Sequence, residues 1–268
     1  MFRDPPGRPP ELHPSWLEHL HLMSPASPPI EAVCCVSDWQ TFAQHLGRSP
    51  CLQRGGWPLT TVWNASSAAA AFNRVLDTAE AGSWVLWAHQ DAHLPLGFDR
   101  QLGESMREAE RRWPDVDVIG VYGTLPTRGP SVATGPRAGR LLDRGEPLIE
   151  PVDLPCEAAG LDEVVLLVRG ASRLRMDPAL GFDFYGTDLA LQARRAGRRA
   201  VIVDAWCEHW SDLPRGGAMS AVKRARLKSS AAAFEAKWRD ALPIATPCFQ
   251  IDRVGDVARF IDLHSHDA

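Results

Sequence analysis

Short apolar runs alternate with helix-forming stretches along most of this chain of 268 residues. The runs that predict β-strands are Ala32–Val36, Leu59–Trp63, Trp84–Ala88, Val116–Tyr122, Val164–Val168 and Ala200–Val203. The stretches that predict helices are Trp39–Leu46, Ser66 or Ser67 to Ala81, Leu102–Arg112, Leu189–Ala196 and Ser220–Leu242. Strands that alternate with helices favour a mostly parallel sheet with helices on both faces. The sequence therefore predicts a fold of the α/β class.

Composition narrows the class of protein further. Apolar residues make up 45% of the chain and charged residues 23%, which favours a packed globular core. The formal net charge of -4 gives no basic field to hold a nucleic acid, so we expect no nucleic-acid partner. No apolar run reaches about 18 residues, so no membrane span is expected. The six cysteines form no CxxC pair and the start shows no secretion signal, which favours a reducing cytoplasm.

We expect one large domain between two shorter segments. Residues 1–28 are rich in proline and polar groups and predict a loose leader. Residues 29–242 hold the strands and helices of a single domain, and residues 243–268 form a C-terminal extension. Within the domain, Gly123–Pro147 is rich in Gly, Pro and Arg and predicts a long surface excursion with little core.

The third predicted strand ends abruptly in His89-Gln90-Asp91. Side chains at the carboxyl end of a strand face the crevice of an open α/β sheet. Asp91 could therefore hold a divalent cation that neutralises a diphosphate, or it could simply cap the turn toward Pro95. His89 could be a second ligand or a hydrogen-bonded structural residue. The residues alone leave both alternatives open.

Two later clusters also carry reactive side chains. Asp188 stands at a predicted helix start, where a carboxylate either caps the helix or acts as a general base for an acceptor hydroxyl. His209 follows the sixth strand and is either structural or a metal ligand.

Two charged segments have both a functional and a structural interpretation. Asp162-Glu163 precedes the fifth strand and is either a solvated turn or a carboxylate pair that binds acceptor hydroxyls. Arg215 lies in a glycine-rich loop that leads to Lys223, and these cations could meet phosphate. The alternative is the solvated basic face of a helix.

Taken together, these segments resemble the glycosyltransferases of the GT-A fold, a Rossmann-like α/β fold, and specifically the family-2-like bacterial group. The resemblance spans about Ile30 to Trp210 and rests on the segments Val33–Asp38, Trp84–Asp91, Leu161–Glu163 and Phe182–Leu189. It implies a hexosyltransferase-like enzyme of glycan biosynthesis that uses Mn²⁺ or Mg²⁺. Such an enzyme moves a sugar, with inversion, from a nucleoside-diphosphate sugar to a hydroxyl of a glycan, lipid-linked or protein acceptor.

The resemblance also implies where the donor would bind. It places Asp38 and Asn64 beside the base and ribose, and it aligns His89-Gln90-Asp91 with the family's DxD motif. His89 stands in place of the first Asp, so Asp91 is the retained metal ligand. His209 resembles a late histidine that completes the metal shell in some members.

For the reaction itself, the resemblance implies that Asp188 is the catalytic base, although Thr187 stands where the family has Glu. Arg215 or Lys223 would offset charge on the leaving group. The aromatic residues expected to pack on sugar rings are Phe184, Tyr185 and Trp210.

Two other functions stay open at this level. A non-catalytic nucleotide-sugar-binding module on the same fold is motivated by the departure at His89. A metal-dependent hydrolase would need more ligands than Asp91 and His209.

Overall fold

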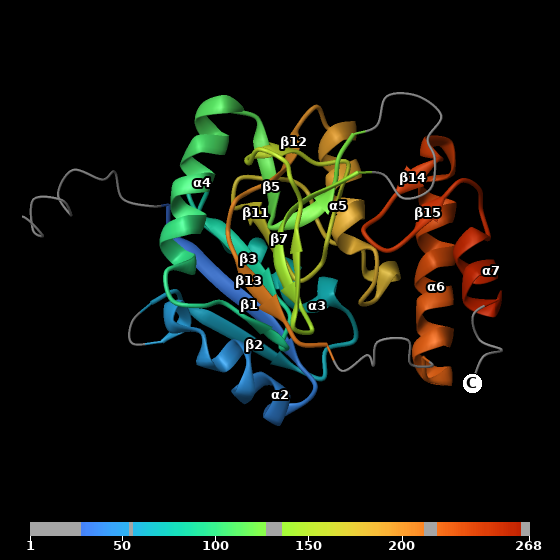
Figure 1. Ribbon diagram of the computed structural model, residues 1–268, viewed down its shortest axis with the longest axis horizontal. Helices are drawn as coiled ribbons and strands as arrows, with labels where there is room; N and C mark the ends of the chain where they lie inside the picture. The colour runs from blue at the N-terminus through green and yellow to red at the C-terminus, as the bar shows by residue number, and fades with distance from the viewer. Residues whose placement is uncertain (1–27, 54–55, 127–135, 212–218, 264–268) are drawn as a thin grey trace, which may run out of the picture.

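The structure is a computed structural model that describes residues 28–53, 56–126, 136–211 and 219–263. The predicted leader lies outside these residues except for its last position. The main feature is a seven-stranded sheet with the order β2-β1-β3-β11-β5-β12-β9 (Figure 1). Its strands are β1 Ile30–Val36, β2 Leu59–Trp63, β3 Trp84–Ala88, β5 Val116–Gly120, β9 Cys156–Glu157, β11 Val165–Arg169 and β12 Arg199–Ile202.

Most strands of this sheet run in one direction. β1 pairs in parallel with β2 and β3, and β12 pairs in parallel with β5. β11 is antiparallel to both β3 and β5 and lies between them, while β9 is antiparallel to β12 at the edge. The prediction of a mostly parallel sheet is confirmed, and the carboxyl ends of β1, β2 and β3 meet at one edge.

Helices cover both faces of the sheet, as predicted. On one face, α2 (Trp39–Gln44) and α4 (Phe98–Arg112) contribute to a core that includes alternate residues of β1 and β3. On the other face, α3 (Ala68–Leu76) and α5 (Tyr185–Arg195) pack on the intervening residues. Because side chains alternate along a strand, β3 can bury every one of its residues only when both faces are covered.

Local capping decides where two of these helices begin. The Ser67 hydroxyl accepts the Ala70 N–H at 3.1 Å, so Ser67 rather than Ser66 caps α3. The Asp38 carboxylate accepts the Thr41 N–H at 2.6 Å and caps α2.

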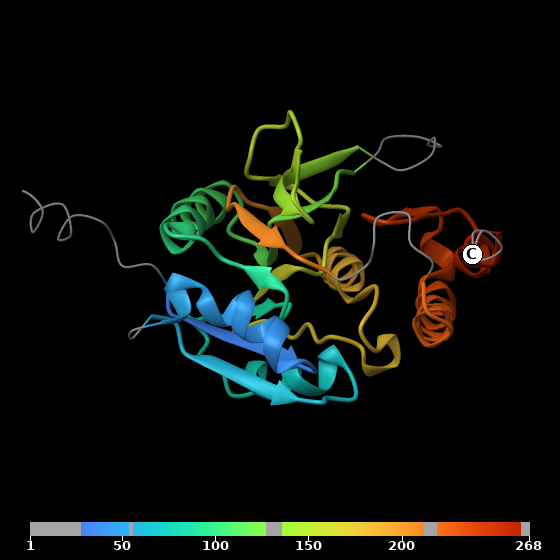
Figure 2. The same cartoon turned by 60° about the horizontal axis from the view of Figure 1, so that its bottom comes forward.

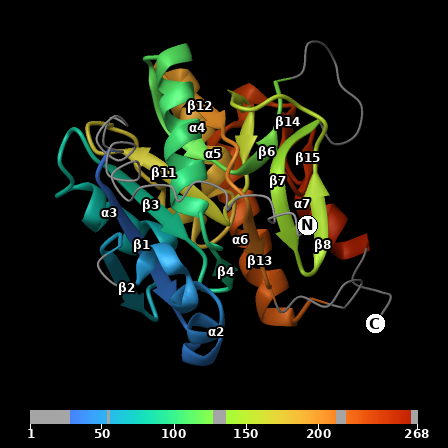
Figure 3. The ribbon, with the colours of Figure 1, turned by 60° about the vertical axis from the view of Figure 1, so that its left-hand side comes forward.

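A second sheet has the order β10-β6-β7-β13-β4, with β8 paired to β7 (Figure 3). Its strands are β4 Ala92–His93, β6 Tyr122–Thr124, β7 Arg137–Asp143, β8 Glu146–Ile149, β10 Gly160–Leu161 and β13 Cys207–His209. The prediction that Gly123–Pro147 is a surface excursion with little core was wrong for β7, which lies inside this sheet with Ala138 and Leu141 buried. Gly139 and the exposed Arg140 separate Ala138 from Leu141, so β7 has neither an apolar run nor an apolar alternation that the sequence would show.

The C-terminal part forms a third core. α6 (Ala221–Lys237) packs against α7 (Asp256–Leu263) and a two-stranded sheet of β14 (Ile244–Ala245) and β15 (Gln250–Ile251). Figures 1 and 2 show α6 and α7 side by side, at the opposite end of the molecule from α4. The predicted boundary between the domain and a C-terminal extension at residue 243 stays a prediction. Within the described ranges, no helix combines the length and apolar character needed to cross a membrane.

Candidate active site

Three potential metal ligands converge beside the carboxyl end of β3. Asp91 Oδ1 lies 3.8 Å from His89 Nδ1 and 3.6 Å from His209 Nε2, and the donor atoms all lie within 4.8 Å of one another. The pairing of β13 with β4 sets His209 opposite Ala92. The backbone N–H of Trp210 donates to the Asp91 carbonyl at 2.9 Å, which also holds the end of β13 beside Asp91. The structure thus brings together the two predicted ligands and adds His89.

The donor set fits a divalent cation. Two ligands that each lie about 2.0–2.2 Å from one ion are at most about 4.4 Å apart, and both Asp91 distances fall within this limit. Two imidazole nitrogens and one carboxylate oxygen suit Mn²⁺ better than Mg²⁺, which prefers oxygen ligands only. The three side chains are 15–27% exposed, so substrate or water oxygens can complete the shell.

His209 is held in the tautomer that such a centre requires. Its Nδ1 lies 3.1 Å from Asp143 Oδ1, and Asp143 is itself paired with Arg144 at 2.8 Å. A proton on Nδ1 leaves the lone pair of Nε2 facing Asp91. Burial lowers the pKa of His209, but the hydrogen bond to Asp143 and the charge of Asp91 outweigh it and raise that pKa. The His209 hydrogen bond also lowers the pKa of Asp143.

We expect Asp143→Asn to weaken Mn²⁺ binding by about 10–100-fold, because the residues behind a metal ligand typically contribute this much. The dissociation constant would be measured by titrating the metal-free protein with Mn²⁺ and detecting the free ion by electron paramagnetic resonance. Asp77→Asn is the matched control, since Asp77 also pairs with an arginine at 2.8 Å but follows the last residue of α3. Equal dissociation constants for the two variants would contradict the role of Asp143.

A cavity of about 570 Å³, which we call the strand-end pocket, opens beside these ligands. It lies at the carboxyl ends of β1, β2 and β3 and is lined by Ser37, Asn64, Ala65, His89, Gln90, Asp91, Phe182, Lys223, Arg226 and neighbouring residues. This volume is within the range of small-molecule and cofactor sites. Of the residues predicted to bind the nucleotide, the structure brings Asn64, His89 and Lys223 to this pocket.

Gln90, which follows β3, is connected by hydrogen bonds to the residues that follow β1. Its Oε1 accepts the N–H groups of Ser37 and Asp38 at 2.9 and 3.1 Å, and its Nε2 donates to the Ser37 hydroxyl at 3.0 Å. Sequence reasoning missed this role of Gln90, since its partners lie more than fifty positions earlier in the chain. The Asp38 side chain is exposed and caps α2, and the Thr41 N–H lowers its pKa. Its contact with a nucleotide stays a prediction.

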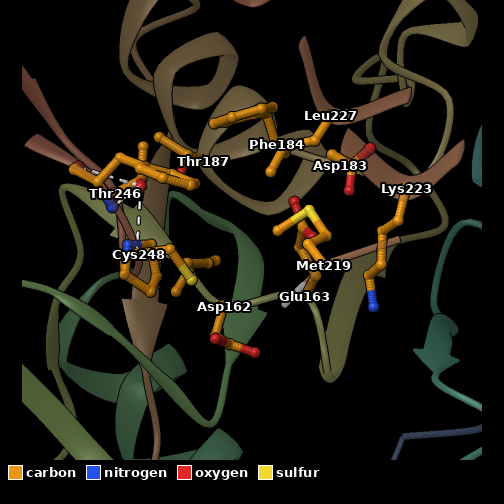
Figure 4. Close-up of a pocket in the computed structure, with 13 residues that line it drawn as sticks. Asp162, Glu163, Asp183, Phe184, Thr187, Met219, Lys223, Leu227, Thr246 and Cys248 are labelled. Atoms are coloured by element: carbon orange, nitrogen blue, oxygen red, sulfur yellow. Dashed lines mark hydrogen bonds between the residues drawn. The ribbon is translucent and has the colours of Figure 1, made fainter. Parts of the chain in front are cut away.

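A second cavity of about 220 Å³, the acidic pocket, adjoins the first through Lys223, which lines both. In Figure 4, Asp183 and Lys223 lie on one side of this pocket and Thr246 and Cys248 on the other, with Asp162 and Glu163 between them. The remaining wall is largely apolar and includes Phe184, Leu227 and Phe249.

The carboxylates of the acidic pocket differ in their partners. Asp183 accepts from Arg226 at 3.0 and 3.2 Å and from Ser230 at 3.0 Å. Asp162 accepts the Val164 N–H at 3.0 Å. Burial, followed by the negative charges of Asp183 and Asp162, raises the pKa of Glu163 well above its usual value. These surroundings therefore favour the protonated form of Glu163, and a carboxyl group with a perturbed pKa beside a cavity is a candidate for proton transfer.

The structure places Asp188 elsewhere, which corrects its predicted role as base. Its side chain is 0% exposed and lines neither pocket. Its carboxylate accepts from Trp238 Nε1 at 2.7 Å, from Lys237 Nζ at 2.7 Å and from Gln192 Nε2 at 2.6 Å. Asp188 therefore fastens α6 to α5, because its position on the first turn of α5 faces the third core rather than the crevice.

Burial limits the predicted sugar contacts of two aromatic residues. Tyr185 lines the strand-end pocket and Phe184 lines the acidic pocket, but they are only 1% and 6% exposed, so little of either ring faces a bound sugar. Trp210 is 38% exposed, but its ring stacks with His45 and lines a separate pocket with His45 and His93. The sugar contact of Trp210 stays a prediction, and Arg215 lies outside the described residues.

Fold and site together define an α/β protein with a candidate divalent-cation centre beside two adjoining pockets. No protein-family model matches the chain. A curated protein of Fuscovulum blasticum described as "ATP synthase subunits region ORF 6" is 32% identical over 138 residues, which are 48% of this chain and 52% of that protein. The chain thus spans about half the length of the curated relative it matches.

Three solved structures are among those similar to the chain. GalNAc-T7 with UDP, GalNAc and Mn²⁺ aligns with 90% of this chain and 55% of its own, at 8% identity and a TM-score of 0.48. S. aureus TarS 1–349 aligns over 79% and 73%, at 12% identity and a TM-score of 0.41. The 4-diphosphocytidyl-2C-methyl-D-erythritol synthase of Anaerococcus prevotii aligns over 78% and 100%, at 9% identity and a TM-score of 0.33. At these values the likenesses assign neither an activity nor a ligand.

Proposed function

We propose that this protein is a glycosyltransferase of the GT-A type that binds a nucleoside-diphosphate sugar in the strand-end pocket. The observation that carries the proposal is the convergence of His89, Asp91 and His209 at the edge of that pocket, which Lys223 and Arg226 also line. A diphosphate needs positive charge around it, and a cation centre beside Lys223 provides it. The order of the segments that resemble the GT-A enzymes supports the same conclusion.

Each part of the strand-end pocket then has a task. His89, Asp91 and His209 would hold the ion, and the ion, when bound, supplies positive charge that offsets the departing diphosphate. Lys223 adds charge at the junction of the two pockets. Arg226 is already paired with Asp183, so it serves mainly to hold that carboxylate in place. Of the two ions that the resemblance implies, Mn²⁺ is preferred, because Mg²⁺ is bound through carboxylate, phosphate and water oxygens.

The acceptor would enter the acidic pocket. A new bond forms between the acceptor oxygen and the anomeric carbon while the bond from that carbon to the diphosphate breaks, and the hydroxyl proton passes to the Glu163 carboxylate. Glu163 takes the role first expected of Asp188, because its raised pKa favours proton uptake and it lines the pocket. Inversion, a hexosyl donor, a glycan, lipid-linked or protein acceptor and a cytoplasmic location belong to this proposal.

A thermal-shift screen tests donor binding. We expect one of the common nucleoside diphosphates to raise the melting temperature in the presence of Mn²⁺ and to lose that effect when EDTA is added. A ligand at 100 times its dissociation constant stabilises the native state by about 2.7 kcal/mol, which is readily measured. Failure of every nucleoside diphosphate to shift the melting temperature would contradict the proposal.

The same protein separates the alternative functions. Tight nucleotide binding without transfer to any acceptor would favour a non-catalytic binding module. Release of free sugar at full rate in the absence of an acceptor would favour a hydrolase.

A further inference from the structure

The Tyr185 hydroxyl lies directly behind the candidate metal centre. Its oxygen is 2.7 Å from His89 Nε2, 3.0 Å from Trp87 Nε1 and 3.4 Å from the carbonyl oxygen of Glu163. The ring is 1% exposed and packs edge-on against Trp87, with ring centres 5.7 Å apart. Tyr185 lines the strand-end pocket, but very little of its side chain is exposed there, and its hydroxyl makes these three contacts with the protein.

The three contacts of this hydroxyl can all be hydrogen bonds in one arrangement of the protons only. An indole nitrogen can only donate, so the Tyr185 oxygen accepts from Trp87. A carbonyl can only accept, so the longer contact to Glu163, at 3.4 Å, forms only if Tyr185 gives it its single hydroxyl hydrogen. The remaining contact is then a hydrogen bond only if His89 Nε2 carries a proton and donates it to the second lone pair of the Tyr185 oxygen. In the opposite tautomer, Tyr185 would donate to His89, and the Glu163 carbonyl would lose this donor.

We propose that Tyr185 is a positioning residue that holds His89 in the tautomer protonated on Nε2 and so turns the Nδ1 lone pair toward the metal centre. The inference rests on the proposed function, since it assumes a divalent cation between His89, Asp91 and His209. Nδ1 is the ring atom that lies 3.8 Å from Asp91 Oδ1, so it is the atom that must be free of a proton. Tyr185 thereby does for His89 what Asp143 does for His209.

Tyr185→Phe removes the hydroxyl and keeps the ring, so it tests the hydrogen bond with little change in packing. Tyr122→Phe is the matched control. These are the two tyrosines of the chain, and Tyr122 is likewise buried, with its hydroxyl donating to Glu150 at 2.6 Å. We expect Tyr185→Phe to weaken Mn²⁺ binding by about 10–100-fold and Tyr122→Phe to leave it unchanged.

A second measurement reads the tautomer itself. In the metal-free protein, nitrogen-15 NMR of the histidine rings should show His89 protonated on Nε2 in the wild type and in Tyr122→Phe. In Tyr185→Phe it should show a mixture of tautomers or the Nδ1-protonated form. A wild-type His89 protonated on Nδ1 would overturn the inference without any variant, so the test survives even if Tyr185→Phe fails to fold.

The outcomes separate the two proposals. If the wild type does not bind Mn²⁺ at all, the metal-assisted function is contradicted. If the wild type binds Mn²⁺ and Tyr185→Phe binds it equally well, only the role of Tyr185 is overturned. Weaker binding with an unchanged tautomer would also overturn it, because Tyr185 would then act only through packing.

Discussion

Replacing Glu163 by Gln should lower the rate of sugar transfer by about 10²–10⁴-fold, the usual contribution of a general base. A glutamine keeps the size and the hydrogen-bonding oxygen of Glu163 but cannot take up the acceptor proton. Binding of Mn²⁺ and of the nucleoside diphosphate should be unchanged, because Glu163 lines the acidic pocket and not the strand-end pocket. Initial rates and equilibrium titrations on the same preparations would show this separation.

The variant should also remain folded. The pKa of Glu163 is raised in the native protein, so its ionised form is less favourable there than in the unfolded chain. The resulting loss of stability is present above the native pKa and disappears as the pH falls below the unfolded value. Glutamine is neutral at every pH and avoids this loss, so its free energy of unfolding at neutral pH should equal or exceed that of the wild type.

Two further observations make the test of Glu163 specific. In the wild type, activity should fall on acidification at a pH above the usual range of a glutamate, and this acid limb should vanish in Glu163→Gln. Glu110→Gln is the control, because Glu110, on α4, pairs with Arg169 of β11 and lines neither pocket. Retention of wild-type transfer by Glu163→Gln would remove Glu163 from the mechanism.

Replacing Asp188 by Asn should instead act on stability, with an expected loss of about 2–4 kcal/mol in the free energy of unfolding. The change removes the buried negative charge that Lys237 faces at 2.7 Å between α5 and α6. Lys237 keeps a second partner, Asp177, at 2.8 Å, which limits the loss. Urea denaturation followed by tryptophan fluorescence would measure the difference.

Two further variants show whether the effect comes from the buried pair. Asp177→Asn removes the other partner of Lys237, but Asp177 is 28% exposed, so a loss below about 1 kcal/mol is expected. The double variant Asp188→Asn with Lys237→Met removes both charges but keeps a side-chain oxygen that can accept from Trp238, and it should recover part of the stability. If Asp188→Asn is fully stable and loses more than a hundredfold in transfer, the original assignment of Asp188 as base was correct.

Two strands could be placed from the sequence because a short run of strand-forming residues that ends at polar residues is a local signal. Leu59–Trp63 and Trp84–Ala88 are strands with the predicted ends, since each is a continuous run of suitable residues followed by polar ones. The direction of β11 could not be predicted, because a short apolar run has no local signal for parallel or antiparallel pairing. β7 was missed for a related reason, since Gly139 and Arg140 interrupt its apolar residues and leave no local strand signal.

By itself, the sequence determined the α/β class and the position of His89 and Asp91 at a strand end, because both follow from local patterns of apolar residues and turns. Only the tertiary structure decided which side chains complete the site. Asp143 meets His209 across 66 positions of the chain, and Tyr185 meets His89 across 96. Asp188 accepts hydrogen bonds from Lys237 and Trp238, some fifty positions later, and does not face the crevice. Such contacts depend on how helices and strands pack, which no local pattern of residues records.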